Sequence, residues 1–150
     1  MPKTVDDSSY LTSKDKRLGL LLWFRLSRFF NQSIRRSNQH LKEWELSASQ
    51  FDILVQVKTH KRLTQKKLGE KMLVTKGNIT QSITKLEHRG LVQRERDRKT
   101  KYLSLTEKGQ RLYEEVVPEQ EQFQASQFSN LTREEQVQLL ELLKKLGPLK

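Results

Sequence analysis

Apolar residues recur at helical spacing along most of the chain, and this pattern predicts a mainly α-helical protein. The first periodic stretch begins near Lys14 and ends at His40 or Leu41. Its two apolar stripes consist of Leu18, Leu22, Leu26 and Phe29, and of Trp23, Phe30, Ile34 and Leu41. A helix with two such stripes is expected to contact two different neighbours.

Residues that cap helices mark the next elements. Ser47 opens a capping box, which predicts a helix that ends near His60. Thr64 and Thr75 stand at N-cap positions before two further short apolar stretches, and only residues 72–74 separate the two predicted helices. Two short helices with so brief a connector are typical of a helix–turn–helix.

The segment after the second short helix has the pattern of a β-hairpin. Gly90 suits the C-terminal end of the preceding helix, and residues 91–105 then alternate as two strands. The tip of the hairpin, residues 96–99, carries too many charges to be buried. The hairpin is therefore expected to project from the helices.

Two helices complete the predicted fold. Thr106 caps the first, which Pro118 is expected to kink or locally break. Thr132 and Glu135 form another capping box at the start of the second, whose apolar stripe reaches Leu146. The predicted fold class is mainly α with a small β-hairpin, in which a helix–turn–helix lies between N- and C-terminal helices.

Positive charge is concentrated in the helix–turn–helix and the hairpin. The segment from Lys61 to Lys101 contains 13 Lys or Arg and 4 Asp or Glu, a net charge of +9, while the whole chain has +11. Residues 1–60 have a net charge of +4 and residues 102–150 one of −2. A local positive field on a helix–turn–helix predicts binding to double-stranded DNA.

The helix predicted to begin at Thr75 has an apolar side centred on Ile79 and a polar side opposite. The polar side consists of Gly77, Gln81, Thr84 and His88, flanked by Asn78, Thr80 and Lys85. Gln81 can pair bidentately with adenine, and Thr84 can meet a polar base edge or a thymine methyl group. This side is therefore expected to enter the major groove.

Phosphate contacts are expected around this helix and along the hairpin. The N-terminal amides near Thr75 and Lys76 form a candidate phosphate site, and Thr64 and Gln65 face the opposite phosphates. The basic residues of the hairpin are Arg94, Arg96, Arg98, Lys99 and Lys101. Arginine on a projecting tip suits the narrow minor groove, where the potential is most negative.

At these residues the chain resembles the MarR family of winged helix–turn–helix regulators. The matching segments are LSASQFDILVQV (46–57), LTQKKLGEKMLVTKGNITQSITKLEHRGLV (63–92) and DRKTKYLSLTEKG (97–109). The resemblance covers most of residues 14–146. It implies that the helix near Thr75 is the recognition helix, that residues 97–99 are the wing tip, and that the first and last helices interlock into a homodimer.

The resemblance also implies a division of the chain. We expect a flexible N-terminus over residues 1–13, a dimerisation helix over 14–45, a DNA-binding lobe over 46–105, and C-terminal helices over 106–150 that complete the dimer interface.

The wing departs from the family pattern. It is about three residues shorter than in the family, so it is expected to reach less deeply into the minor groove. Lys99 takes the place of the last arginine of the family's wing motif, and lysine lacks the planar fork of arginine. Sequence preference through the wing is therefore expected to be weaker.

Other chemistries find little support in the sequence. The absence of cysteine excludes disulfides, thiol redox sensing and Cys-ligated zinc. The three histidines have no ligand spacing, so we expect no metal, no cofactor and no enzymatic activity. Residues 1–17 are polar and no apolar run is long enough to span a membrane, so a cytoplasmic protein is expected.

Several aromatic residues are open to two interpretations. The aromatic candidates for an effector pocket between the dimer helices and the DNA-binding lobe are Trp23, Phe24, Phe30, Trp44 and Phe51. At helical spacing such residues also suit a core or an interface. In the resembling family, small aromatic acids and lipophilic compounds often bind near that junction.

The sequence thus predicts a homodimeric transcriptional regulator, in particular a repressor that binds a pseudo-palindromic operator. A small-molecule effector is expected to relieve this repression. The rival hypothesis is a winged-helix module for protein–protein contact, without sequence-specific DNA binding.

Overall fold

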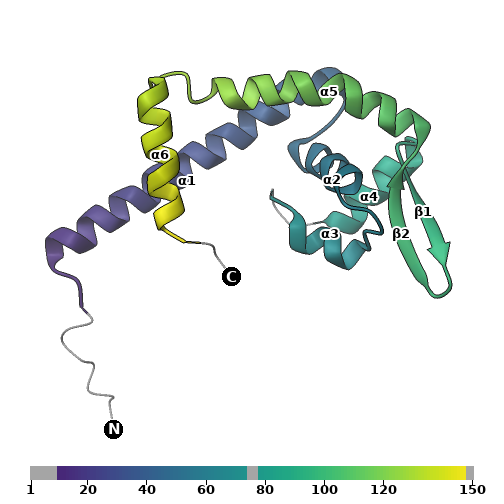
Figure 1. Cartoon of the computed structure of the whole chain (residues 1–150), viewed down its shortest axis with the longest axis horizontal. Helices are drawn as coiled ribbons and strands as arrows, with labels where there is room; N and C mark the ends of the chain where they lie inside the picture. Colours follow the sequence, from purple (N-terminus) through teal and green to yellow (C-terminus); the bar gives the residue numbers. More distant parts are fainter. Residues whose placement is uncertain (1–9, 74–77, 148–150) are drawn as a thin grey trace, which may run out of the picture.

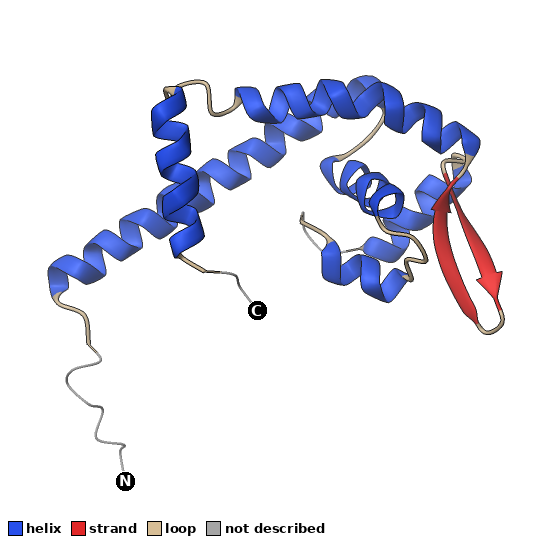
Figure 2. Cartoon of the chain, in the orientation of Figure 1, coloured by secondary structure: helices blue, strands red, loops and turns tan. Residues whose placement is uncertain are grey.

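A computed structural model describes residues 10–73 and 78–147 of the chain. The described residues form a mainly helical fold with one small antiparallel sheet (Figures 1 and 2). The elements in chain order are α1 (Ser13–Leu41), the 3₁₀ turn η2 (Lys42–Trp44), α2 (Ala48–Thr59), α3 (Gln65–Lys71), α4 (Ile79–His88), β1 (Val92–Asp97), β2 (Thr100–Leu105), α5 (Glu107–Ser126) and α6 (Arg133–Lys145). The predicted fold class is confirmed.

The long helix α1 and helix α5 join two parts of the molecule. The C-terminal half of α1 and the length of α5 lie above a lobe made of α2, α3, α4 and the hairpin (Figure 1). The N-terminal half of α1 extends away from that lobe, and α6 lies beside α1. Residues 1–9, most of the expected flexible N-terminus, lie outside the described residues.

The core lies inside the lobe and below the junction of α1 with α5. Each helix of the lobe buries one face, and the base of the hairpin closes the remaining side. The side chains that are almost fully buried include Leu41, Ile53, Leu54, Leu63, Leu68, Ile83, Leu86, Leu91, Val92 and Val116. Burial of these aliphatic side chains is the main source of stability for the lobe.

Side-chain caps fix where most helices begin. Ser47 accepts a hydrogen bond from Gln50 N and Gln50 Oε1 accepts one from Ser47 N, which completes the predicted capping box of α2. Thr132 makes the corresponding box with Glu135 in α6. Thr64 caps α3 in the same position. These predicted starts are confirmed.

The sequence predicts a kink or a local break at Pro118, and the structure shows no break. Helix α5 is continuous from Glu107 to Ser126 with Pro118 inside it. Proline removes one backbone hydrogen bond, but Val116 and Gln120 on either side of it are buried, at 1% exposure each. Packing of this face against α1 therefore outweighs the local preference.

A polar cluster lies buried between α1 and α5. Gln120 Nε2 donates to Ser37 Oγ at 3.2 Å, and Gln120 Oε1 lies 2.7 Å from His40 Nδ1. The His40 ring stacks on Phe123, with ring centroids 4.4 Å apart. Because a buried amide needs its partners, this cluster favours the observed register between the two helices.

The hairpin has a regular register. Val92 pairs with Leu105 at its base, and Asp97 pairs with Thr100 beside the two-residue turn. Leu63, which follows α2, adds a single antiparallel bridge to Leu103. The strands predicted over residues 91–105 are confirmed, and only the base of the hairpin joins the core.

Candidate nucleic-acid interface

Helix α4 presents the polar face that its sequence predicts. Ile83 and Leu86 are fully buried, while Gln81, Thr84 and His88 on the opposite side are exposed. Asn78, Thr80 and Lys85, the predicted flanks of this face, are exposed as well. The face is therefore open to a ligand, and its residue types can donate and accept hydrogen bonds at base edges.

The predicted start of this helix is wrong. Helix α4 begins at Ile79, and Asn78 before it adopts a left-handed conformation with φ of 60° and makes no side-chain cap. Asparagine tolerates the left-handed conformation better than most residues. Because a left-handed residue cannot belong to a right-handed helix, the helix cannot run unbroken from Thr75. Thr75, Lys76 and Gly77, with the phosphate site expected there, lie outside the described residues.

A side-chain hydrogen bond ties α3 to α4, because Gln65 Nε2 donates to Thr80 Oγ1 at 2.7 Å. Within α4, Thr84 Oγ1 donates to the Thr80 carbonyl oxygen at 2.8 Å, so its hydroxyl proton is engaged in the helix. The side chain of Thr64 accepts a hydrogen bond from Lys67 N, as expected of a cap, and its proton remains available as a donor. Gln65 is therefore engaged within the protein, while Thr64 can still donate to a phosphate.

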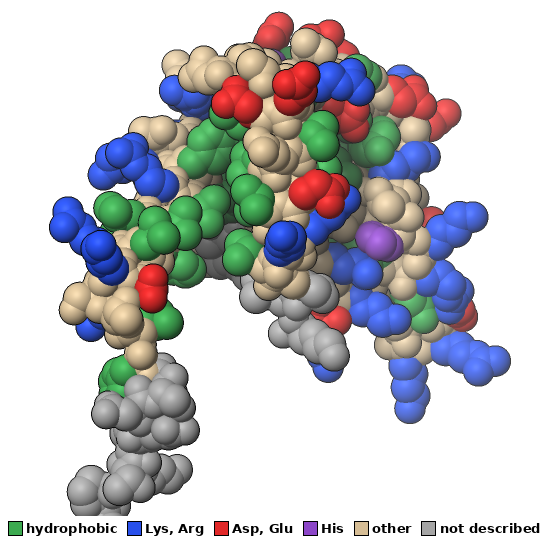
Figure 3. All heavy atoms as spheres, turned by 60° about the vertical axis from the view of Figure 1, so that its left-hand side comes forward, with side chains coloured by type: hydrophobic (Ala, Val, Ile, Leu, Met, Phe, Trp, Pro, Cys, Tyr) green, Lys and Arg blue, Asp and Glu red, His purple; other side chains and the backbone are tan. Residues whose placement is uncertain are grey.

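The hairpin presents a dense set of cations near its end. Arg98 lies in the turn with φ of 59°, and Arg96 Nε donates to the Arg98 carbonyl oxygen at 3.0 Å. Lys99 and Lys101 are exposed beside them. Lys and Arg side chains gather at the right of the space-filling view, and others lie at the left beside the hydrophobic surface (Figure 3). The basic end of the hairpin and the polar face of α4 therefore belong to the same lobe.

Arg94 differs from the other predicted contacts. Its Nε donates to Glu87 Oε1 at 3.1 Å, and the two side chains are 29% and 32% exposed. The pair joins β1 to α4. Arg94 is thus partly neutralised and serves the packing of the hairpin as well as any phosphate contact.

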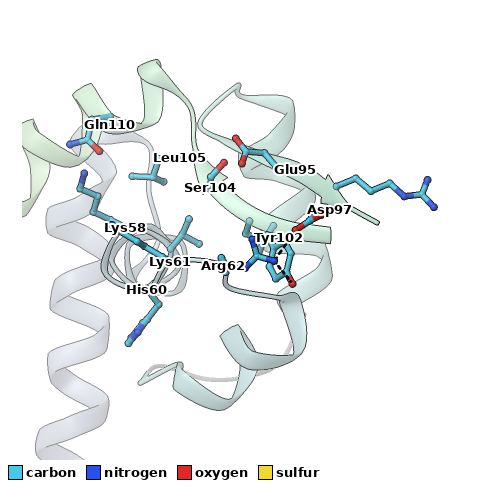
Figure 4. A pocket seen from close by; sticks show the side chains of 13 residues that line it. Lys58, His60, Lys61, Arg62, Glu95, Asp97, Tyr102, Ser104, Leu105 and Gln110 are labelled. Carbon is cyan, nitrogen blue, oxygen red and sulfur yellow. Dashed lines mark hydrogen bonds and ion pairs between the residues drawn. The ribbon is translucent and has the colours of Figure 1, made fainter. Parts of the chain in front are cut away.

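Sequence reasoning missed Arg62, which contacts both strands of the hairpin. Its Nη2 donates to Asp97 Oδ2 at 2.9 Å and to Tyr102 Oη at 3.1 Å, and its guanidinium carbon lies 4.3 Å from the centre of the Tyr102 ring (Figure 4). The hydrogen bond to Asp97 and the Tyr102 hydroxyl raise the pKa of Arg62 above its ordinary value. Arg62 lies in a loop, and no sequence pattern indicates that it bonds to residues of the hairpin.

Comparison with known proteins identifies the family. The family model for the MarR family matches residues 46–100. The chain is 46% identical over 134 residues to an HTH-type transcriptional regulator of Bacillus cereus, with 89% of this chain and 91% of the relative covered. The chain belongs to the MarR family. It is a DNA-binding transcriptional regulator, and the hairpin is the wing of the family fold.

Solved structures of MarR-family proteins are similar along almost their whole length. A MarR-like regulator from Bacillus cereus superposes with a TM-score of 0.79 at 21% identity, covering 87% of this chain and 96% of that chain. BpsR of Bordetella bronchiseptica superposes with a TM-score of 0.71 at 25% identity, covering 97% of this chain and 100% of that chain. The first likeness supports the fold alone.

The five aromatic residues predicted to line one pocket are separated in this MarR-family chain. Phe30 and Phe51 line a common cavity of about 340 Å³, together with Phe29 and Phe128. Trp23 and Phe24 do not line this cavity, and each is more than 60% exposed on α1. Trp44 Nε1 instead donates to Glu115 Oε1 at 3.2 Å. In the single chain, therefore, Phe30 and Phe51 share one cavity, while Trp23, Phe24 and Trp44 lie outside it.

Neither a metal site nor a membrane-spanning helix is found in the described part of the chain. Across residues 10–73 and 78–147, no group of three or more His, Asp or Glu side chains is placed to hold a metal ion. None of the helices described there is long and apolar enough to cross a bilayer.

Proposed function

We propose that the protein is a homodimeric transcriptional repressor that binds a pseudo-palindromic operator. In this proposal, the polar face of α4 enters the major groove of each half-site and the wing reaches the neighbouring minor groove. Two recognition helices related by a twofold axis require half-sites about 34 Å apart, or one turn of B-DNA.

The observation that carries the proposal is the exposed polar face of α4 beside the cationic wing. Gln81, Thr84 and His88 lie on a face without apolar side chains, above the buried Ile83 and Leu86. The residues that we assign to DNA contact are Thr64, Asn78, Thr80, Gln81, Thr84, Lys85, His88, Arg94, Arg96, Arg98, Lys99 and Lys101. Base contacts are assigned to α4, while the lysines and arginines of the wing supply phosphate and minor-groove contacts.

Dimerisation is supported by a large apolar surface on α1 and α6. Leu18, Leu22, Trp23 and Phe24 on α1 are each more than half exposed, and so are Val137, Leu140 and Leu142 on α6. Hydrophobic side chains gather between these two helices in Figure 3. A monomer rarely exposes so much contiguous apolar surface, so a second copy of the chain is the proposed occupant.

An effector is supported by the cavity between α1 and α2. Its lining is mainly apolar, with Phe30, Phe51 and Phe128 around it. Gln127 also lines it, and Gln127 Oε1 is buried without a hydrogen-bond partner among the described residues. In BpsR, DNA binding is regulated by 6-hydroxynicotinic acid. A small aromatic molecule with a hydrogen-bond donor would suit the cavity of this chain.

The decisive experiment has two steps. Duplexes that bind the full chain are first selected from a pool of random double-stranded DNA, and the recovered sequences should be pseudo-palindromic with half-sites about 10 base pairs apart. Binding of the selected duplex is then titrated with salt. A dimer that contacts at least six phosphates should give a log–log slope of about −5 or steeper, and a slope near zero would refute the proposal.

Matched variants separate base contacts from phosphate contacts. Gln81→Ala with Thr84→Ala should weaken binding to the selected duplex while leaving binding to unrelated DNA and the salt slope unchanged. Arg98→Glu with Lys99→Glu should weaken binding to both duplexes and make the slope shallower. If neither pair of changes affects DNA binding, the rival protein–protein module becomes the better explanation.

A further inference from the structure

The wing must be oriented before it meets DNA, and its own structure gives it little stiffness. Six residue pairs from Val92–Leu105 to Asp97–Thr100 make a ribbon about 17–20 Å long. A two-stranded ribbon is at best marginally stable in water on its own. The side chains of its outer half are exposed, apart from the half-buried Tyr102. Something outside the hairpin therefore has to hold its outer half.

Arg62 makes that connection. Of the described residues outside the hairpin, it is Arg62 whose side chain hydrogen-bonds to the outer half, through Asp97 Oδ2 and Tyr102 Oη. Asp97 is the last residue of β1 and Tyr102 belongs to β2, so one guanidinium contacts both strands. The ring of Tyr102 lies under the same guanidinium at 4.3 Å.

The backbone at Arg62 is itself fixed. Arg62 adopts a left-handed conformation with φ of 56°, and the next residue, Leu63, is buried and accepts a hydrogen bond from Leu103 N at 2.8 Å. Arg62 thus lies directly before the residue at which the chain after α2 pairs with β2. Figure 4 shows Arg62, Asp97 and Tyr102 together at the edge of a cavity of about 380 Å³ between α2 and the wing.

We propose that Arg62 is a positioning residue that holds the wing in its DNA-binding orientation through Asp97 and Tyr102. This inference rests on the proposed contact between wing and DNA. Both side-chain hydrogen bonds of Arg62 go to the hairpin, so in this proposal its effect on binding passes through the wing tip, Arg98 and Lys99. A wing that is fixed in advance loses less conformational entropy when it enters the groove.

Asp97 gives a test in which two explanations predict opposite signs. If only charge matters, Asp97→Ala removes a negative charge near DNA, frees Arg62, and should tighten binding. If Arg62 positions the wing, the same change should weaken binding by about two- to tenfold, which corresponds to the ordering of one or two flexible side chains. Glu95→Ala is the matched control, because Glu95 lies two residues earlier on the same strand and has no bond to Arg62.

Arg62→Lys is the second test, since it keeps the charge. Lysine could also donate to both partners from one nitrogen, as Arg62 Nη2 does, but it lacks the planar guanidinium that lies 4.3 Å from the Tyr102 ring. Binding should therefore weaken in the same range as in Asp97→Ala. Charge alone predicts no change for this variant. Because an exposed ion pair contributes little to global stability, both variants should unfold at the same urea concentration as the wild type.

A double-mutant cycle shows whether the effect passes through the tip. Affinity is measured by fluorescence anisotropy on a selected duplex of about 30 base pairs, long enough for two half-sites. In a chain that already carries Arg98→Ala and Lys99→Ala, Asp97→Ala should have no further effect, because there is no tip to position.

The outcomes distinguish failure of the proposed function from failure of the role of Arg62. Wild-type protein that shows no salt-dependent DNA binding would overturn the proposed function. Wild-type protein that binds DNA, combined with unchanged or tighter binding by Asp97→Ala and Arg62→Lys, would overturn the role of Arg62 alone. The role of Arg62 would also be overturned if Asp97→Ala still weakened binding in the chain that carries Arg98→Ala and Lys99→Ala.

Discussion

Gly109 lies where helix α5 passes closest to the base of the wing, so its replacement tests how tightly the two are packed. The N–H of Gly109 donates to Thr106 Oγ1 at 3.0 Å, and Thr106 N donates to the Leu91 carbonyl oxygen at 3.1 Å. A Cβ atom at position 109 would lie 1.9 Å from that same oxygen and 2.9 Å from the Leu91 carbonyl carbon. The obstacle is backbone, which a change of rotamer cannot move.

Two opposing effects decide the magnitude for Gly109→Ala. Alanine is preferred over glycine inside a helix by about 1 kcal/mol, which alone would stabilise the variant. Against this, relief of the clash requires the first turn of α5 and Leu91 to separate by about 1.5 Å, because ordinary contacts begin at 3.4 Å. Such overpacking destabilises by about 1–3 kcal/mol or more, and hydrogen bonds at the junction add about 1 kcal/mol each. We expect a net loss of about 2–3 kcal/mol.

Urea unfolding followed by circular dichroism measures this loss. With a slope of about 2 kcal/mol per molar, the midpoint should fall by about 1 M. All proteins must be compared at one concentration, since a dimer's apparent stability depends on it. Gly69→Ala is the matched control, because among the described residues its new Cβ meets Ile79 Cδ1 at 3.4 Å, an ordinary contact, and it should raise the midpoint. A Gly109→Ala protein at least as stable as the wild type would show that the junction is not closely packed.

Two further predictions concern helix α2 and the apolar surface. Ser47→Ala removes the cap of α2 and should lower the free energy of unfolding by about 1 kcal/mol, measured by the same urea titration; an unchanged value would mean that water replaces the cap. Leu140→Asp places a charge on the exposed apolar face of α6 and should reduce the sedimenting mass from twice 17.8 kDa to 17.8 kDa at micromolar concentration. A wild-type chain that sediments as a monomer would contradict the proposed interface.

Local signals in the sequence were sufficient for most of the fold. The boxes at Ser47 and Thr132 and the cap at Thr64 act within one helical turn, so they can be recognised without knowledge of the rest of the chain. Pro118 shows the limit of such local signals. Proline disfavours a helix interior, as the prediction assumes. Val116 and Gln120 beside it are nevertheless buried, and Gln120 donates to Ser37 of α1, a contact that no local pattern reveals.

The candidate site divides in the same way. The polar face of α4 follows from helical periodicity alone, which is why Gln81, Thr84 and His88 are found exposed as predicted. The start of α4 did not follow, because the helical pattern of apolar residues does not reveal that Asn78 adopts a left-handed conformation. The partnership of Arg62 with Asp97 spans 35 positions of sequence, so only the folded chain reveals it.

The cavity and the connector between α3 and α4 meet at one buried carboxylate. Asp52 Oδ2 accepts a hydrogen bond from Leu73 N at 2.7 Å, and both residues line the cavity that contains Phe30 and Phe51. Leu73 follows α3 in the connector to α4, so a molecule that enters the cavity would contact the start of that connector. The same cavity is lined by Ser37 and Gln120, which favour the observed register of α1 against α5. If the proposed effector binds there, it would contact both the connector that leads to α4 and the polar contact between α1 and α5.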